Sequence, residues 1–188
     1  SIGAQIGTKT YDTGFHVTPP SPWQVQKYLR RAANSGSKYF VLEATSHGLD
    51  QNRLACVNFK VAVLTNITQD HLDYHKTWQN YALAKAKLFK NTQFSILNLD
   101  DAKSYDFLKS RVSGKLTTYG LKSDANLSLD SIRLKLKIPG NFNLENALAA
   151  AAACQALGVS QRNITRALNS FTGIKGRLEE VILGQNFK

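Results

Sequence analysis

The sequence predicts an α/β fold in which a mostly parallel, Rossmann-like sheet lies between two layers of helices. Near-continuous apolar runs at 38–44 and 61–64 suit strands that are buried on both faces of a parallel sheet. Segments with helical periodicity alternate with the strand-like runs, which is typical of a three-layer α/β domain. Both runs end in polar side chains, and open α/β sheets bind ligands beyond the carboxyl ends of their strands.

The elements follow in a regular order. The chain opens with a strand at 2–7 and a loop at 8–20. Ser21, Pro22 and Gln24 then mark the start of a helix, because Ser21 can cap it, Pro22 suits its first turn and Gln24 completes a capping box. Beyond the two apolar runs we expect helices at 77–90, 101–112, 143–157 and 160–171, strands at 94–97 and 116–119, and an added antiparallel hairpin at 127–138.

Length and composition indicate one ordinary globular domain. Apolar residues make up 43% of the 188 residues and charged residues 20%, and no apolar run approaches the length of a membrane span. Cys56 and Cys154 lie in apolar surroundings without CxxC spacing, so we expect two buried thiols. These features favour a cytoplasmic monomer that does not bind a membrane.

The formal charge is +11, from 24 basic and 13 acidic residues, and such a balance favours anionic partners. A solvated basic surface and a substrate that carries phosphates both fit this charge. Nucleic acid is the weakest alternative, because the lysines are scattered and no basic run reaches five residues. We therefore expect no nucleic-acid partner.

Two strand ends carry candidate metal ligands. Glu43 closes the first apolar run, and His71 lies a few residues after the second. If the two strands are neighbours, a carboxylate and an imidazole converge there, and this pair suits a divalent cation. The alternative is a buried carboxylate that accepts hydrogen bonds from backbone amides.

Lys85 interrupts the apolar stripe of the helix at 77–90, which consists of Trp78, Tyr81, Ala82, Leu88 and Phe89. A lysine that points into a core is costly unless it is paired or neutral. It could instead extend its amine to the edge of the core. Lys87 and Lys90 lie off the stripe and need no such explanation.

Five motifs resemble the Mur ligases, and the resemblance as a whole runs in order from about residue 2 to 183. The motifs are EATSHGL at 43–49, TNITQDHLDYH at 65–75, YALAKAKLF at 81–89, GNFNLENALAA at 140–150 and GRLE at 176–179. The Asp-His-Leu-Asp-Tyr-His run at 70–75 is most similar to the MurE branch, the UDP-N-acetylmuramoyl-tripeptide synthetases.

The resemblance implies the central domain of a ligase of peptidoglycan and cell-wall synthesis, and hence of cell shape and division. Such a ligase uses ATP and Mg²⁺ to add a diamino acid to UDP-N-acetylmuramoyl-L-alanyl-D-glutamate. Lys85 would be a carbamylated lysine that holds Mg²⁺ with Glu43 and His71. The resemblance further assigns Asn66, Asn143, Asn146 and Arg177 to the nucleotide, and Thr18, Thr45, Gln51 and Arg53 to the UDP-sugar-peptide.

Several of these residues have structural alternatives. An asparagine at 141 or 143 could cap the helix that begins there, and Arg53 could be a surface residue. We interpret His16, His47, Asp73 and His75 as structural. If Lys85 is unmodified, we expect it near Glu43 and His71, with an ion pair to Glu43 or Asp70.

The chain also departs from the family pattern. The phosphate-binding Gly-x-x-Gly-Lys-Thr/Ser loop is absent, and Lys76 stands where a glycine is common. We therefore expect 1–178 to be a central domain without its phosphate loop, 179–188 to be a strand or linker towards a carboxyl-terminal domain, and the fragment to be inactive. The alternatives are a related ligase, of the folylpolyglutamate or cyanophycin synthetase type, and a non-catalytic module that binds a nucleotide or a protein.

Overall fold

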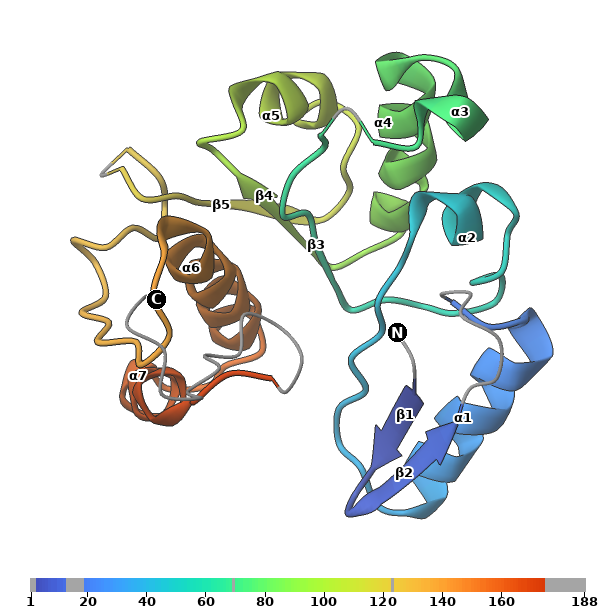
Figure 1. Ribbon diagram of the computed structural model, residues 1–188, viewed down its shortest axis with the longest axis horizontal. Coiled ribbons are helices and arrows are strands. Elements are labelled where there is room, and N and C mark those ends of the chain that lie inside the picture. The colour runs from blue at the N-terminus through green and yellow to red at the C-terminus, as the bar shows by residue number, and fades with distance from the viewer. Residues whose placement is uncertain (1–2, 13–18, 69, 123, 175–188) are drawn as a thin grey trace, which may run out of the picture. The chain divides into compact units, whose positions relative to one another are not determined.

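The computed structural model describes residues 3–12, 19–68, 70–122 and 124–174 (Figure 1). The chain divides into two compact units. Unit 1 comprises Ser1–Ala62, Ile67–Ser95 and Asp106–Gly114, and unit 2 comprises Val63–Asn66, Ile96–Tyr105 and Lys115–Lys188. The elements are β1 (Gly3–Ile6), β2 (Lys9–Asp12), α1 (Pro22–Asn34), α2 (Ser46–Asp50), β3 (Val61–Val63), α3 (Leu72–His75), α4 (Trp78–Ala86), η1 (Lys87–Phe89), β4 (Phe94–Asn98), α5 (Ala102–Leu108), β5 (Lys115–Tyr119), α6 (Asn141–Ala156) and α7 (Gln161–Ser170).

A three-stranded parallel sheet with the order β3-β4-β5 confirms the predicted α/β class. Its central strand β4 supplies Ile96 and Leu97, both fully buried, and Ala62 of β3 is buried as well. The predicted strands at 61–64, 94–97 and 116–119 therefore form where the sequence places them. Their apolar runs form strands because each lies beside another strand that accepts and donates its backbone hydrogen bonds.

The antiparallel hairpin of the fold lies at β1 and β2, where Gly3 pairs with Asp12 and Ile6 with Lys9. The predicted loop at 8–20 is therefore wrong in its first residues, and its stretch 13–18 lies outside the described residues. The predicted hairpin at 127–138 is also wrong. Leu127 forms an isolated parallel bridge with Tyr119, and a turn follows in which Ser131 Oγ accepts from the Ser128 amide and donates to the Ser128 carbonyl, both at 2.8 Å.

Helix α1 begins as the sequence predicts. Ser21 Oγ accepts a hydrogen bond from the Gln24 amide at 3.5 Å, and Gln24 Oε1 accepts one from the Ser21 amide at 3.2 Å. This reciprocal pair is a capping box, with Pro22 at the first helical position. The helix buries Val25, Tyr28 and Ala32 on one face.

The predicted strand at 38–44 does not form. Phe40 packs against the cluster of Ile6, Tyr28 and Ala32, and Leu42 packs against the cluster of Val25, Leu49 and Leu54. The alternate side chains face outwards, with Tyr39 60% and Val41 95% exposed. The prediction of burial on both faces is therefore wrong, since only one face of this extended segment is covered within the described part of the chain.

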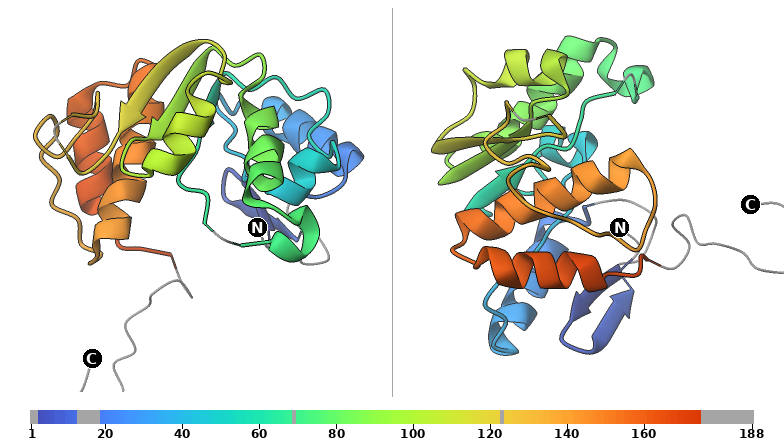
Figure 2. Two further views of the ribbon diagram at one scale, coloured as in Figure 1. Left: turned by 90° about the horizontal axis from the view of Figure 1, so that it is seen from above. Right: turned by 90° about the vertical axis from the view of Figure 1, so that its left-hand side faces the viewer.

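In unit 2, α6 packs against β5 and α7, and α6 and α7 lie side by side (Figure 2). The buried face of α6 consists of Ala147, Leu148, Ala149, Ala151 and Ala152. Small side chains let neighbouring elements approach closely, while Leu148, fully buried, fills the remaining space. The alanine-rich composition of this helix is thus a packing feature.

The prediction of two buried thiols is wrong for Cys56 and met only in part by Cys154. Cys56 is exposed and Cys154 is half-buried, and neither forms a disulfide. Among the described residues, no helix combines the length and the apolar character needed to cross a bilayer.

Candidate active site

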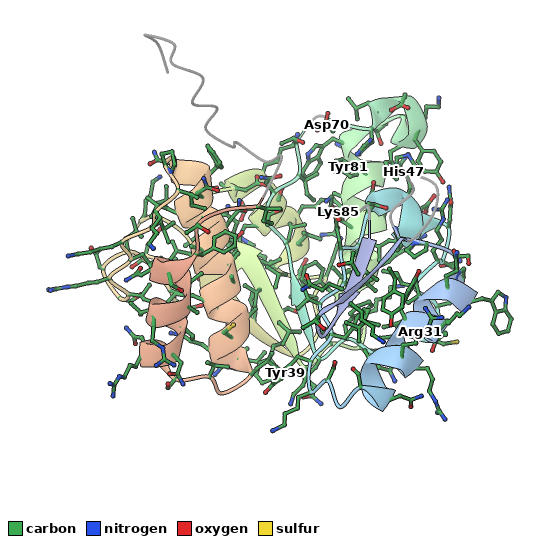
Figure 3. All side chains as sticks on the ribbon, turned by 60° about the horizontal axis from the view of Figure 1, so that its bottom comes forward. Arg31, Tyr39, His47, Asp70, Tyr81 and Lys85 are labelled. Carbon is green, nitrogen blue, oxygen red and sulfur yellow. The ribbon has the colours of Figure 1, made fainter. Side chains whose placement is uncertain are left out.

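Lys85 lies on α4, which begins at Thr77, where the threonine hydroxyl accepts a hydrogen bond from the Asn80 amide at 3.1 Å. Tyr81, Ala82 and Ala84 of this helix are buried, and Lys85 is half-buried. Its Nζ lies 5.2 Å from the centre of the Tyr81 ring; both residues are labelled in Figure 3. Burial lowers the pKa of Lys85 below its usual value.

The expected ion pair of Lys85 is wrong. Within the described residues, the lysine approaches neither Glu43 nor Asp70 to ion-pair distance. Its contact is instead the face of the Tyr81 ring. The gap in the apolar stripe therefore marks a lysine that is partly withdrawn from water and forms no ion pair with a carboxylate of the described residues.

His71 begins the single turn α3 in a left-handed conformation, with φ 59° and ψ 25°. Lys76 ends the same turn with φ 66° and ψ −38°, a region that side chains with a Cβ rarely adopt. Lys76 therefore occupies a backbone position for which glycine is better suited. The turn is therefore strained at its end.

Five rings from three elements form one contiguous group, the ring cluster: His47, His71, Tyr74, His75 and Tyr81. The His47 ring lies 5.0 Å from His71, 4.2 Å from Tyr74 and 5.4 Å from His75, measured between ring centres. Tyr81 stacks on His75 at 5.2 Å and meets His71 edge-on at 5.9 Å. Tyr81 thus contacts His71 on one side and Lys85 on another.

His75 is buried, like Tyr81, and its Nε2 has no hydrogen-bond partner among the described residues. Burial lowers the pKa of His75, and positive charge on His47 would lower it further. Asp50 and Asp73 oppose this shift to a smaller extent. The ring cluster therefore favours a neutral imidazole at this position.

Helix α2 places the candidate substrate residues. Thr45 caps it by accepting a hydrogen bond from the Gly48 amide at 3.1 Å. A Cβ at Gly48 would collide with the ring of Pro19, so glycine is required where this helix meets the chain. Arg53 is half-buried and donates from Nη1 to the Pro19 carbonyl at 3.2 Å, so it is more than a solvated surface residue.

A polar bridge that the sequence did not reveal links α2 to α3 and η1. Lys87 Nζ lies 2.7 Å from Asp50 Oδ1, and Tyr74 donates its hydroxyl proton to Asp50 Oδ2 at 3.1 Å. Gln51 Nε2 reaches the Tyr74 hydroxyl at 3.5 Å. The hydrogen bond from Lys87 lowers the pKa of Asp50. The sequence pattern assigned no role to Lys87, but in the structure it connects η1 to α2, which lies far from it along the chain.

Glu43 is exposed at the rim of a cavity of about 310 Å³ that is lined by Ile6, Val25, Tyr39 and Val41 among others. It forms no hydrogen bond or ion pair with His71 or Lys85. Among unmodified His, Cys, Asp and Glu side chains of the described residues, no set of three is arranged to hold a metal ion. Of the three candidate ligands, His71 and Lys85 both contact Tyr81.

The candidate nucleotide residues lie in unit 2. Asn66 and Asn146 are exposed, and Asn143 is half-buried and donates from Nδ2 to the Pro139 carbonyl at 2.6 Å. The cap of α6 is Gly140, with φ 102° and no side-chain cap bond, so the capping alternative for the asparagines is wrong. Thr18 and Arg177 lie outside the described residues.

The backbone before Asn66 is fixed by two side chains that sequence reasoning missed. Tyr119 donates its hydroxyl proton towards the carbonyls of Leu64 and Thr65, at 3.1 and 3.3 Å. Asn98 Nδ2 donates to the same Thr65 carbonyl at 3.1 Å. Burial raises the pKa of Tyr119, and the negative charges of Glu145, Asp101 and Asp100 add to this. Tyr119 therefore stays a proton donor at neutral pH.

Together these features define a class: an α/β protein with a parallel sheet, polar side chains after its strands, and a half-buried lysine beside clustered imidazoles. The pattern called the Mur ligase middle domain matches residues 1–154. The chain belongs to the Mur ligase family.

Individual relatives agree with this assignment. The chain is 37% identical to the UDP-N-acetylmuramoyl-L-alanyl-D-glutamate–2,6-diaminopimelate ligase of Caldanaerobacter subterraneus, and covers 42% of that relative with all of its own length. It is 34% identical to the ligase of the same name from Clostridium botulinum, over 99% of the chain and 42% of the relative. The chain thus spans less than half the length of these relatives.

A solved structure supports the fold. The structure of MurF from Acinetobacter baumannii superposes with a TM-score of 0.57 at 23% identity, over 68% of this chain and 32% of that one. At this level of identity the likeness concerns the fold alone.

Proposed function

We propose that this chain is the central domain of an ATP-dependent ligase that adds a diamino acid to UDP-N-acetylmuramoyl-L-alanyl-D-glutamate in cytoplasmic peptidoglycan synthesis. The observation that carries the proposal is the 34–37% identity to relatives named for that reaction, over nearly the whole chain. The half-buried Lys85 beside the ring cluster agrees with it. We further propose a monomer with neither a membrane nor a nucleic-acid partner.

Lys85 is the residue on which the proposed chemistry depends. Burial favours its neutral amine, and a neutral amine can attack carbon dioxide. In that step a C–N bond forms, one C–O double bond opens, and a proton leaves to solvent, so that the lysine becomes a carbamate anion. A side chain that is costly to bury as a cation thus becomes an anionic ligand for a positive ion.

The proposed ion is Mg²⁺, held by the Lys85 carbamate, Glu43 and His71. Magnesium usually takes only one or two protein carboxylates and keeps several waters, so two or three ligands are enough. His71 and Lys85 fit, because both contact Tyr81. When bound, the ion would neutralise negative charge on the phosphates of ATP.

The remaining residues would bind the two large substrates. On α2 and after it, Thr45, Gln51 and Arg53 would hold the UDP-sugar-peptide, together with Thr18. Asn66, Asn143, Asn146 and Arg177 would hold the nucleotide. The formal charge of +11 suits both substrates, since each carries phosphates.

A domain replacement tests the proposal. Residues 1–188 would replace the matching stretch of the Clostridium botulinum relative, with that relative's own phosphate loop kept. We expect phosphate release that requires both the muramoyl dipeptide and diaminopimelate, and we expect Lys85→Met to abolish it. Lys90→Met, a lysine outside the apolar stripe, is the matched control and should retain it.

Two other outcomes would redirect the assignment. Phosphate release that depends on a folate or on a cyanophycin-type peptide would favour a related ligase. A folded chimera that binds nucleotide without any turnover, even at high substrate concentration, would favour a binding module.

The 188-residue chain alone should neither ligate nor bind ATP tightly, because it contains no Gly-x-x-Gly-Lys-Thr/Ser loop whose amides could hold the phosphates. Calorimetric titration with ATP and Mg²⁺ measures this directly. A submicromolar affinity would contradict it.

A further inference from the structure

Tyr81 contacts both Lys85 and His71. Its ring centre lies 5.2 Å from Lys85 Nζ and 5.9 Å from the His71 ring centre, with the two rings almost perpendicular. Lys85 is one turn further along α4, whereas His71 caps the separate turn α3. Tyr81 therefore joins two side chains that the backbone alone would leave independent.

The ring is itself fixed on a further side. His75 stacks on Tyr81 at 5.2 Å with an angle of 19° between the planes, and only 5% of the tyrosine is exposed. A buried, stacked ring has little freedom to turn, so side chains that rest on it inherit a defined position.

The hydroxyl contributes less than the ring. No described hydrogen bond involves the Tyr81 hydroxyl, whereas every contact named above is made by the ring. Phenylalanine at this position would keep those contacts, and an aliphatic side chain of similar volume would fill the space without a flat surface.

We propose that Tyr81 is a positioning residue: its ring orients the His71 imidazole and the Lys85 side chain towards a common cation. The proposal rests on the proposed function, because that function makes the two side chains ligands of one ion. Residues that orient the ligands of a metal typically change metal affinity or activity by 10- to 100-fold when removed. Tyr81 would act in this way without touching the ion.

The test uses the 188-residue chain with ¹³C-labelled lysine and histidine. The mobility of Lys85 Cε and of His71 Cε1 is measured by NMR relaxation, with signals assigned through Lys85→Met and His71→Gln. We expect both groups to be ordered in the wild type and in Tyr81→Phe, and both to become mobile in Tyr81→Leu. Tyr28→Leu is the matched control, since Tyr28 is a buried tyrosine of the same unit that packs with Ile6 and Ala32.

Unchanged mobility in Tyr81→Leu would overturn the proposal, as would equal loosening by Tyr28→Leu. Loosening by Tyr81→Phe would assign the effect to the hydroxyl and would also overturn it. If Tyr81→Leu does not fold, Tyr81→Met supplies an unbranched side chain for the same comparison.

A second readout separates this proposal from the proposed function. In ¹³C-bicarbonate with Mg²⁺, the wild type and Tyr81→Phe should show a Lys85 carbamate signal, and Tyr81→Leu should show it about tenfold weaker or not at all. A wild type without this signal, but with ordered Lys85 and His71 that loosen in Tyr81→Leu, would refute the carbamate and leave the positioning role standing.

Discussion

The ring cluster of unit 1 and the start of α6 in unit 2 both carry candidate site residues, yet they are built differently. In the ring cluster the candidate residues pack on one another, and burial changes the pKa of His75 and of Lys85. At the start of α6, Asn146 is exposed and the Asn143 side chain donates to the nearby Pro139 carbonyl. Packing thus holds the side chains of the ring cluster in a defined arrangement, whereas the start of α6 presents polar side chains that contribute little to stability.

The largest effect should come from the buried face of α6. Leu148→Ala removes a fully buried side chain and should lower the free energy of unfolding by about 2–5 kcal/mol. Denaturant unfolding at constant m-value measures this loss. A loss under about 1 kcal/mol would mean that α6 gains its stability elsewhere than from this face.

The strained turn beside the ring cluster predicts a gain instead. Lys76→Gly removes a Cβ from a residue at φ 66° and ψ −38° and should raise the free energy of unfolding by about 1 kcal/mol, after the entropic penalty of glycine is subtracted. Thermal unfolding measures it. Asn91→Gly, at φ 64°, is a second positive-φ site at which a smaller gain is expected, since asparagine tolerates that conformation better than lysine does.

The ring cluster should also make stability depend on pH. The folded-state pKa of His75 lies below 6.5, so in the window below pH 6.5 the unfolded chain binds more protons than the folded one. Stability is therefore complete above that window and falls as the pH falls through it. His75→Phe keeps a ring, removes the unpartnered Nε2 and should flatten this dependence. Unfolding curves of both proteins between pH 5 and 8 check it; equal slopes would contradict the assignment.

A smaller change is expected at the polar bridge between α2 and η1. Asp50→Asn breaks a partly exposed ion pair and should cost under about 1 kcal/mol, less at high salt. Since the pKa of Asp50 is lowered, its contribution is present above pH 3.8 and is lost as the pH falls through the lowered value. A double-mutant cycle with Lys87→Met isolates the pair, and zero coupling at low salt would show that the bridge contributes nothing.

The smallest effect belongs to the second half of the comparison. Asn146→Ala should change the free energy of unfolding by no more than about 0.5 kcal/mol, because the side chain is exposed. The same denaturant measurement as for Leu148→Ala serves as its test. A cost above about 1 kcal/mol would mean that the start of α6 is as tightly built as the ring cluster.

The sequence predicted local features well. The capping box at Ser21 and Gln24 is readable because its partners are three residues apart, and the strands at 61–64 and 94–97 are readable from their apolar runs. Lys85 could be singled out because one lysine interrupts a stripe whose period is known. In each of these cases the determining interactions lie within one element or its neighbour.

Features that depend on distant partners could not be predicted. The run at 38–44 has the composition of a buried strand. Whether a strand forms depends on a neighbouring strand to pair with, which composition does not reveal, and Val41 of this run is exposed. The bridge between Asp50 and Lys87 joins residues 37 positions apart, and no local pattern marks it. The ring cluster had one weak signal, since His71 and His75 are one helical turn apart, but the approach of His47 required the fold.

Gly48 has a consequence for how tolerant the chain is to mutation. Any side chain there would meet the Pro19 ring and approach Thr45 Oγ1 to 3.2 Å. In a saturation survey, position 48 should therefore accept almost no replacement, whereas the outward-facing Val41 should accept many. A substitution at 48 would first displace Pro19, whose carbonyl binds the candidate substrate residue Arg53, so the survey would score this glycine as if it bound substrate. A saturation survey of this domain will thus mark two kinds of intolerant residue. Some make contacts through their side chains, and others, such as Gly48, leave room for a neighbouring residue.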